Sequence, residues 1–383
     1  MEKFFASCPR GLEKSLAAEL QSLGAARLEA TDGGVTFAGE FPLAYKVNLH
    51  SHVASRVLWL LAQRRYQTEE DVYRAAHALP WTDWFEPELT LRVNVSAIHC
   101  SLPSLDFVTL KIKDAVCDRF REETGRRPSV DTQRPDLRIH AFLDAREIFL
   151  YLDTSGEPLF KRGWRKVQGE APLRENLAAG ILHLASWSPG IPFLDPMCGS
   201  GTFLMEAALM SFNMAPGMGR HFAFEKLKNF NARKWKMLLH ESEQGQKAKT
   251  LLPVYGSDLY GEALKHARAN LAAAGLEGTV ALKQVNVLEI TAPASAGIMV
   301  TNPPYGKRVG EIDELEKFYP QLGDVLKKKF SGWNCYIFSA DMRLPKLIRL
   351  NASKRTPLHN GPLECRLFEY KIVAGSMRKN RPD

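Results

Sequence analysis

Residues 193–204 read FLDPMCGSGTFL, and this stretch decides the fold of the C-terminal half of the chain. A short apolar strand ends at Asp195, and a turn containing Gly199 and Gly201 then leads into a helix. A dinucleotide fingerprint needs a third glycine where Leu204 stands, and no Gly-Lys-Ser/Thr of a P-loop follows. The loop therefore predicts a ligand site that is poorly suited to a pyrophosphate.

Strand and helix signals alternate after this loop. PVYGSD, TVALKQVNV and GIMVT are predicted strands, and GEALKHARANLAAAG is a predicted helix between the first two of them. This order predicts a parallel, doubly wound sheet with ligands at the carboxyl ends of its strands. Asp258 ends the second strand, where a carboxylate can accept hydrogen bonds from both hydroxyls of a ribose, and Asn286 ends the third, near an adenine amino group. The pattern favours an adenosyl site without phosphates.

The sequence TNPPYGKR, residues 301–308, follows the fourth predicted strand. An exocyclic amino nitrogen conjugated to a ring is a poor nucleophile, so an enzyme that methylates it must localise its lone pair. The amide oxygen of Asn302 and the carbonyl of Pro303 can accept the amino hydrogens. Pro304 stiffens the loop, and Tyr305 offers a face for a flipped base. This motif favours amino methylation.

The first 154 residues predict small mixed α+β modules. Helices are expected over 10–24, 42–60 and from about 66 to 80, and a long helix is expected to end at Gly125. Strands are expected over 33–39 and 89–98, with two more around a turn at 144–146. Residues 155–172 are rich in Gly, Pro and charge, which predicts a boundary before a helix at 173–187.

Composition limits the class of protein. Of the 383 residues, 45% are hydrophobic and 25% charged, which excludes a disordered or fibrous chain. The formal net charge is +8, but residues 1–154 carry −3, so attraction to a polyanion is expected mainly from the C-terminal part. The six cysteines are widely separated, which predicts free thiols and no metal site. With no secretory h-region and no long apolar run, we expect a cytoplasmic protein.

Basic clusters are candidates for RNA contact, although such runs are more often solvated faces. KRGWRK (161–166) and RKWK (233–236) place Trp among cations, as stacking on splayed bases requires. In the acidic N-terminal part, RNA binding would need local clustering of cations, for example at Arg119. The RNA-binding candidates are Lys111, Lys113, Arg126, Arg127, Arg162, Trp164 and Arg165.

Several stretches together carry a family resemblance. DPMCGSGT, Asp258 and NPPYG resemble class I S-adenosylmethionine-dependent amino methyltransferases. More narrowly, FASCPRGLEKSLAAEL near the start, RGWR (162–165), APLRENLAA (171–179) and NGPLECRLFEYK near the end resemble the RlmL family of bacterial 23S rRNA guanine-N2 methyltransferases. The resemblance extends over essentially the whole chain.

The resemblance implies an α/β fold in which a Rossmann-like class I methyltransferase domain follows small α+β ferredoxin-like and THUMP modules. The implied domains are a ferredoxin-like segment at 1–42, a THUMP RNA-binding domain at 43–154, a linker at 155–172 and the methyltransferase domain at 173–383. It also implies S-adenosylmethionine as cofactor and, as acceptor, a guanine in 23S rRNA or in an assembling large subunit. Since the chain has one such domain, we expect one methylation.

Site roles carried over from the family fall on matching positions. The implied cofactor contacts are Asp195, Pro196, Gly199, Gly201, Thr202, Asp258 and Asn286. The implied contacts to the target base are Asn302, Pro303, Pro304 and Tyr305. Because Asn286 stands where relatives often have Asp, we expect weaker cofactor binding rather than none.

Other functions are compatible with these motifs. NPPY also serves adenine-N6 methylation of DNA or RNA and glutamine methylation of proteins, and the N-terminal RNA module favours rRNA over these acceptors. Outside enzymes, the alternative is a ribosome-assembly factor that binds RNA without methyl transfer. The intact glycines and the intact NPPY motif disfavour that alternative.

Overall fold

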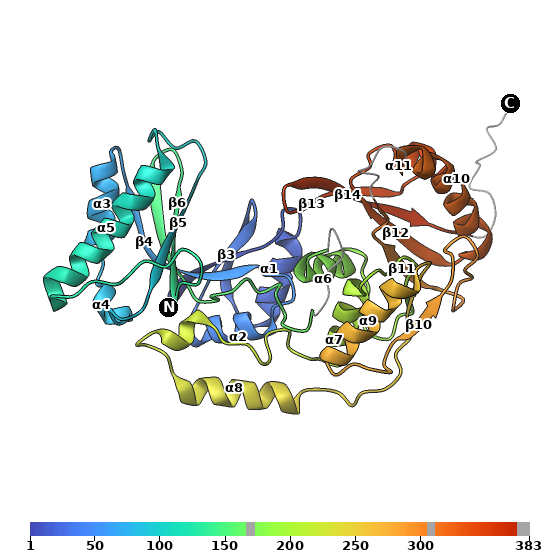
Figure 1. The fold of residues 1–383 in the computed structure, drawn as a ribbon, viewed down its shortest axis with the longest axis horizontal. Coiled ribbons are helices and arrows are strands. Elements are labelled where there is room, and N and C mark those ends of the chain that lie inside the picture. Colours follow the sequence, from blue (N-terminus) through green and yellow to red (C-terminus); the bar gives the residue numbers. More distant parts are fainter. Residues whose placement is uncertain (166–172, 305–310, 374–383) are drawn as a thin grey trace. The chain divides into compact units, whose positions relative to one another are not determined.

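The structure is a computed structural model that describes residues 1–165, 173–304 and 311–373 (Figure 1). The chain forms two compact units, each built from more than one segment. Unit 1 comprises residues 1–8, 16–161 and 217–241. Unit 2 comprises residues 9–15, 162–216 and 242–383. Each unit contains its own seven-stranded sheet.

The sheet of unit 1 has the strand order β2-β3-β1-β4-β7-β6-β5. β5 pairs with β6 in parallel, and the other neighbours are antiparallel. Its strands are β1 (Glu2–Ser7), β2 (Ala26–Thr31), β3 (Gly34–Gly39), β4 (Arg56–Arg65), β5 (Leu91–Ala97), β6 (Leu137–Leu143) and β7 (Glu147–Asp153). One continuous sheet therefore holds all the strands of this unit.

Local sequence signals explain the helices of the N-terminal region. Its helices are α1 (Glu13–Ser22), α2 (Pro42–His50), α3 (Glu69–His77), α4 (Trp81–Trp84) and α5 (Leu105–Thr124). Thr68 and Asp71 form a capping box at the start of α3. Ser104 caps the start of α5, and Gly125 ends it with a φ of 73°, a left-handed conformation that glycine adopts without strain. The predicted long helix ending at Gly125 is confirmed.

The predicted helix over 42–60 is wrong in its second half. Helix α2 ends at His50, and the chain then enters strand β4 at Arg56. Apolar residues from Val57 to Leu61 can fit a buried strand as well as a helix, and pairing with β1 and β7 selects the strand. Strand β2 was also absent from the sequence prediction, because ARLEAT is mostly exposed and lacks a buried alternation.

Residues 217–241 belong to unit 1 although they follow strand β8 of unit 2 in sequence. The segment contains the 3-10 helix η1 (Ala223–Lys226) and most of α8 (Ala232–Gln244). Phe224 is fully buried, with its ring centroid 4.5 Å from that of Tyr45 and 5.1 Å from that of Trp235. The Tyr45 hydroxyl accepts a hydrogen bond from the backbone of Asn231 at 3.0 Å. The insertion thus completes the aromatic core beside α2.

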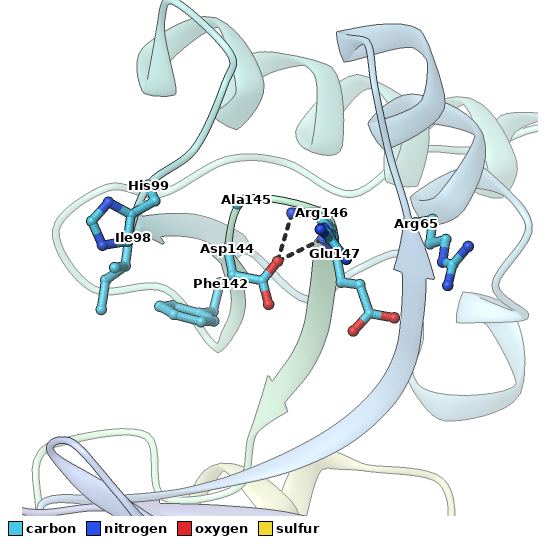
Figure 2. Close-up of a pocket in the computed structure, with 8 residues that line it drawn as sticks. All are labelled: Arg65, Ile98, His99, Phe142, Asp144, Ala145, Arg146 and Glu147. Atoms are coloured by element: carbon cyan, nitrogen blue, oxygen red, sulfur yellow. Dashed lines mark hydrogen bonds between the residues drawn. The ribbon is translucent and has the colours of Figure 1, made fainter.

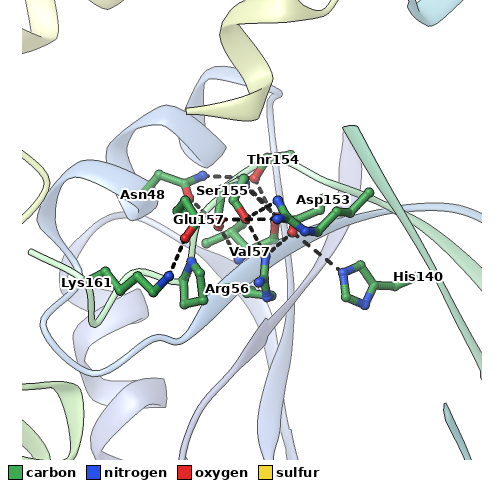
Figure 3. Close-up of polar contacts among 12 residues, drawn as sticks. Asn48, Arg56, Val57, His140, Asp153, Thr154, Ser155, Glu157 and Lys161 are labelled. Carbon is green, nitrogen blue, oxygen red and sulfur yellow. Dashed lines mark hydrogen bonds and ion pairs between the residues drawn. The ribbon is translucent and has the colours of Figure 1, made fainter. Parts of the chain in front are cut away.

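A buried polar network fixes the chain where it leaves β7 (Figure 3). Asp153 is fully buried and forms an ion pair with Arg56. Burial alone would raise the pKa of Asp153, but His140, whose Nε2 lies 3.6 Å from the carboxylate, and the charge of Arg56 hold it below its ordinary value. The next residue, Thr154, accepts a hydrogen bond from Asn48 Nδ2 at 2.9 Å. These bonds connect the last strand of the unit to α2.

The sheet of unit 2 has the order β10-β9-β8-β11-β12-β14-β13. The first five strands in this order are parallel, and β14 and β13 are antiparallel additions. Its strands are β8 (Phe193–Asp195), β9 (Val254–Asp258), β10 (Ala281–Gln284), β11 (Gly297–Thr301), β12 (Trp333–Ser339), β13 (Lys354–Asn360) and β14 (Leu363–Lys371). The predicted doubly wound parallel sheet is confirmed.

The helices of unit 2 are α6 (Glu175–Leu184), α7 (Thr202–Ser211), α9 (Gly261–Ala273), α10 (Glu311–Lys329) and α11 (Leu344–Leu347). Of these, α7, α9 and α10 connect parallel strands. Helix α7 is buried along almost its whole length, which explains its continuous apolar sequence. Among the described helices, none is long and apolar enough to cross a bilayer.

We expect the inserted segment to stabilise unit 1. Phe224→Ala removes a fully buried ring, so the free energy of unfolding of this unit should fall by about 3–5 kcal/mol. Phe107→Ala is the matched control, since that ring is 47% exposed and its loss should change stability by about 0.5 kcal/mol or less. Urea unfolding of both full-length variants measures the difference. Equal effects would contradict a structural role for the insertion.

Candidate active site

The candidate site lies at the carboxyl ends of the parallel strands, beginning with Asp195 at the end of β8. This residue is 2% exposed, and its Oδ1 accepts a hydrogen bond from the backbone of Met197 at 3.2 Å. Burial, with a smaller contribution from the nearby charge of Asp258, raises the pKa of Asp195 to about 8. A carboxyl of this kind would ionise readily beside a positively charged ligand, because such a charge lowers its pKa.

The loop after β8 turns sharply through its two glycines. Gly199 has a φ of 51° and Gly201 a φ of 84°, both in the left-handed region. A Cβ at Gly201 would lie 3.2 Å from the Cβ of Ala267, so glycine also allows α7 and α9 to approach each other. Pro196 is buried, and its carbonyl accepts a hydrogen bond from Ser257 Oγ at 3.3 Å. The loop therefore rests directly on the end of β9.

Asp258 is the residue that ties the neighbouring strand ends together. Its Oδ2 accepts a hydrogen bond from Gly199 N at 2.9 Å, and its Oδ1 accepts one from Tyr260 N at 3.0 Å. Its backbone carbonyl accepts one from Val285 N at 3.1 Å, at the end of β10. Each carboxylate oxygen accepts one backbone bond and has a second lone pair left. Asp258 can therefore hold the loop and still accept two ligand hydroxyls.

Asn286 lies at the third strand end, two residues after β10. It is half-buried, and its side-chain oxygen accepts a hydrogen bond from the backbone of Leu288 at 3.0 Å. The oxygen is thus partly committed to a local turn and keeps one lone pair for another donor. The predicted adenine contact of Asn286 stays a prediction.

The NPPY motif follows β11 and is described only in part. Asn302 is half-buried, Pro303 is buried and Pro304 is exposed. Tyr305 lies outside the described residues, so the predicted stacking face stays a prediction. In the sheet, β11 pairs with β8 through Leu194 and Met299, which brings the strand end carrying Asn302 next to the one carrying Asp195.

The side chains of the predicted RNA-binding residues Arg162, Trp164 and Arg165 are largely buried. The Arg162 side chain is 1% exposed and pairs with Glu206 at 3.3 Å, and Arg165 pairs with Glu175 at 2.8 Å. Trp164 is 6% exposed. In this structure the protein's own carboxylates neutralise both cations and the indole is buried, and the RNA contact of these three side chains stays a prediction. Arg165 also donates to Thr202 Oγ1 at 3.0 Å, beside the glycine loop.

The other RNA-binding candidates lie on or after α5 in unit 1, away from the glycine loop in sequence. Lys111 pairs with Glu70 at 3.5 Å, and Lys113 pairs with Asp114 at 2.7 Å. Arg126 is ion-paired with Glu88, whereas Arg127 is exposed. Acidic neighbours offset three of these four cations. Their RNA contact stays a prediction.

One residue that supports the loop was not singled out from the sequence. Asn270 on α9 is fully buried and donates to the carbonyl of Ser200 at 3.1 Å. A polar side chain one helical turn after buried Ala267, on the face that packs toward the sheet, is the signal that would have revealed it.

We expect the buried carboxyl of Asp195 to make stability depend on pH. Its pKa of about 8 in the folded chain exceeds that of an unfolded aspartate, about 3.9, so the folded state binds the extra proton between these values. Stability without ligand should therefore fall as pH rises from 5 to 7, by up to about 1.4 kcal/mol per pH unit from this group. Asp195→Asn should remove that slope in urea unfolding.

Asp32→Asn, in the exposed turn between β2 and β3, is the control and should keep the wild-type pH dependence. If Asp195→Asn unfolded with the same pH profile as wild type, the buried neutral carboxyl would be excluded.

Family models match the chain in three places. The model of the RMKL-like methyltransferase domain matches residues 162–369. The THUMP domain model matches residues 66–153, and the RlmL ferredoxin-like domain model matches residues 3–58.

Curated relatives match nearly the whole chain. A putative RNA methyltransferase of Synechocystis sp. is 39% identical over 370 residues, which cover 96% of each protein. The ribosomal RNA large subunit methyltransferases K/L of Shewanella frigidimarina and Syntrophotalea carbinolica are 37% and 40% identical and match 100% and 97% of this chain. The chain spans about half the length of these K/L relatives, 54% of each.

Solved structures share the fold over almost the full length. A possible methylase from Clostridium difficile 630 has a TM-score of 0.90 at 27% identity and covers 98% of this chain and all of its own. A putative methyltransferase complexed with SAH has a TM-score of 0.88 at 28% identity, covering 98% of this chain and 99% of its own. A predicted N6-adenine-specific DNA methylase from Listeria monocytogenes has a TM-score of 0.87 at 28% identity, covering 97% and 96%.

The methyltransferase model matches the unit that carries the glycine loop, Asp258 and the NPPY motif, and the Synechocystis relative matches both units at 39% identity. On these grounds the chain belongs to the RMKL-like methyltransferase family.

Proposed function

We propose that this protein transfers a methyl group from S-adenosylmethionine to the N2 amino group of a guanine in 23S rRNA, in the cytoplasm. The observation that carries the proposal is the convergence of Asp195, Asp258 and Asn302 at adjacent strand ends. The names of the K/L relatives support large-subunit rRNA as the acceptor. The THUMP match supports an RNA substrate over DNA, although one similar structure is named a DNA methylase.

The described residues provide separate places for the parts of the cofactor. Asp258 has a free lone pair on each carboxylate oxygen, which suits the two hydroxyls of a ribose. The positive φ of Gly199 and Gly201 exposes backbone in the loop that would surround the methionine part. Asp195, buried beside this loop, would ionise next to the positive charges of the cofactor. The residues present therefore fit an adenosyl cofactor.

The chemistry requires little from acid or base groups. The bound cofactor supplies a methyl group on a sulfonium, which is already a strong electrophile. Asn302 and the Pro303 carbonyl would accept the two amino hydrogens, so that the nitrogen lone pair points toward the methyl carbon. The released proton can leave to solvent after transfer. Buried Cys198 takes no part as a nucleophile, because burial raises the pKa of its thiol well above the ordinary value.

The acceptor is tested directly by methyl transfer from radiolabelled S-adenosylmethionine to protein-free 23S rRNA from a strain that lacks this gene. Mass mapping should find a single N2-methylguanine. A methyl group on adenine N6 would show that adenine, the alternative acceptor, is methylated instead of guanine. Cofactor binding without any transfer to rRNA or to immature large subunits would favour a binding role.

We expect Asn302→Ala to lower kcat by about 100-fold or more, because the substitution removes an acceptor needed in the transition state. The dissociation constant for the cofactor should change little. Asn334→Ala is the matched control and should keep normal turnover. This asparagine is exposed at the N-terminal end of β12, whereas Asn302 follows the carboxyl end of the neighbouring strand β11. Normal turnover by Asn302→Ala would refute the role of the amide oxygen.

We expect Asp258→Ala to weaken cofactor binding. The loss of two charge-assisted bonds at about 1.5–3 kcal/mol each predicts a rise in the dissociation constant of at least about 100-fold. Turnover at saturating cofactor should be retained within about tenfold, since the group does not contact the acceptor. Calorimetry measures the binding, and Asp324→Ala on the exposed face of α10 is the control. Unchanged affinity in Asp258→Ala would exclude the ribose contact.

A further inference from the structure

A hollow of about 480 Å³ lies at one end of the sheet of unit 1 (Figure 2). Three segments far apart in sequence line it: Arg65 at the end of β4, Ile98 and His99 after β5, and Phe142 with residues 144–147 of the β6–β7 hairpin. Its volume falls within the range of about 300–1,000 Å³ that is typical of small-ligand sites. No residue of the candidate active site and none of the RNA-binding candidates lines it.

Hydrogen bonds hold the walls of this hollow in place. Tyr66, which is 4% exposed, donates its backbone N–H to the carbonyl of Arg146 at 3.1 Å and its hydroxyl to the carbonyl of Asp144. The same hydroxyl lies 3.2 Å from the sulfur of Cys100, on the segment after β5. Ile98 donates its backbone N–H to Leu143 at 2.9 Å. The three segments therefore form a preorganised site, which lowers the entropy cost of binding.

Two arginines at this hollow are without ion pairs. Arg65 and Arg146 are exposed, and neither has a carboxylate within ion-pair distance among the described residues. Some other arginines of unit 1 are matched with carboxylates, as in the pairs Arg56–Asp153 and Arg126–Glu88, whereas Arg65 and Arg146 line one hollow together. Two free guanidinium groups at one hollow favour a phosphate, which arginine binds through paired N–H donors.

The apolar part of the hollow suits a nucleic-acid base. Phe142 is half-buried, with its ring 6.1 Å from that of Phe149 and inclined at 45° to it. Ile98 is 44% exposed beside it. Sequence-specific RNA recognition uses splayed bases that stack on aromatic rings, next to arginines that bind the backbone. A base in a duplex is already stacked, so this arrangement fits an unpaired nucleotide.

The two carboxylates of the hollow narrow the choice of base. Asp144 Oδ1 accepts hydrogen bonds from the backbone of Arg146 and Glu147, both at 2.7 Å, and Glu147 Oε2 accepts one from Gln63 at 2.9 Å. Each carboxylate keeps its other oxygen for a further donor. Acceptors of this kind bind the exocyclic amino groups of cytosine, adenine or guanine, a group that uracil lacks, and they repel a second phosphate.

We propose that this hollow binds one unpaired, amino-bearing nucleotide of the RNA substrate, with its phosphate at Arg65 and Arg146 and its base against Phe142. The inference rests on the proposed function, since it names a second contact of the same RNA with a different part of the protein. The contact would fix the RNA through a single-stranded element that the methyltransferase domain does not itself read.

The test uses the full-length chain and labelled twelve-nucleotide oligocytidine. Arg65→Gln/Arg146→Gln should lower affinity at low salt at least about tenfold. It should reduce the slope of log K against log salt by about 0.7, the contribution of one phosphate contact with a single strand. Arg92→Gln/Arg134→Gln carries the same charge change near the opposite ends of β5 and β6 and should shift the slope by less than half as much.

The base contact is tested on the same chain. Phe142→Leu keeps an apolar side chain but removes the ring, so affinity should fall by about 5- to 150-fold, as expected for stacking worth about 1–3 kcal/mol, with the salt slope unchanged. Wild type should bind oligocytidine more tightly than oligouridine. An unchanged slope in the double arginine variant relative to its control would overturn the phosphate contact. Equal binding of the two oligonucleotides would overturn the inference that the carboxylates recognise an amino group of the base.

Methyl transfer separates this inference from the proposed function. If wild type transfers no methyl group to rRNA but the arginine variant has a reduced salt slope, the proposed nucleotide site is supported and the proposed reaction is wrong. If transfer is normal and the arginine variant keeps the wild-type KM for rRNA, the proposed nucleotide site is wrong and the reaction is supported. A raised KM at unchanged kcat supports both.

Discussion

The hydrogen bond from the Gly199 amide to Asp258 Oδ2 is the constraint on which the candidate active site depends. It joins the loop after β8 to the end of β9, and Cys198 N donating to the Ser257 carbonyl at 2.9 Å repeats that connection one residue earlier. Only glycines permit the backbone to turn toward the carboxylate and then enter α7 without strain. Since the Asp258 backbone also accepts from Val285, three loops take their position from one residue. A parallel sheet brings the strand ends together, and these hydrogen bonds fix the positions of the loops that follow them.

The sequence was sufficient for the elements whose signals are local. The glycine loop, the alternating strands and helices around it, and the capped helices α3 and α5 needed no information from distant residues. Strand β4 was misjudged because an apolar run such as Val57–Leu61 has the same composition in a helix and in a strand, and only its partners decide. The exchange of segments between the two units was also beyond local signals, because aromatic contacts of Phe224 with Tyr45 join positions far apart in the chain.

For the candidate site too, local signals could be predicted from the sequence and contacts between distant residues could not. Asp195, Asp258 and Asn302 could be placed from the sequence because the two aspartates end a strand and Asn302 directly follows one. Arg162 and Arg165 were assigned to RNA because their carboxylate partners, Glu206 and Glu175, come from helices that the charge pattern around RGWR does not reveal. A lone glutamate within the apolar helix TFLMEAALMS was the available sign of a buried ion pair. The hollow in unit 1 had no signature, since Arg65, Ile98 and Phe142 follow no common spacing.

The inserted segment also has a consequence for how the protein is made. Trp235 lies 190 residues after Tyr45, and both contribute to the aromatic core that Phe224 completes. At about 5–20 residues per second, translation needs about 10–40 s to deliver the second half of this core after the first has been synthesised. During that interval the nascent N-terminal unit lacks part of its interior, so its folding is completed only after the first part of the following unit, residues 162–216, has been synthesised. Order of synthesis and order of folding therefore differ in this chain.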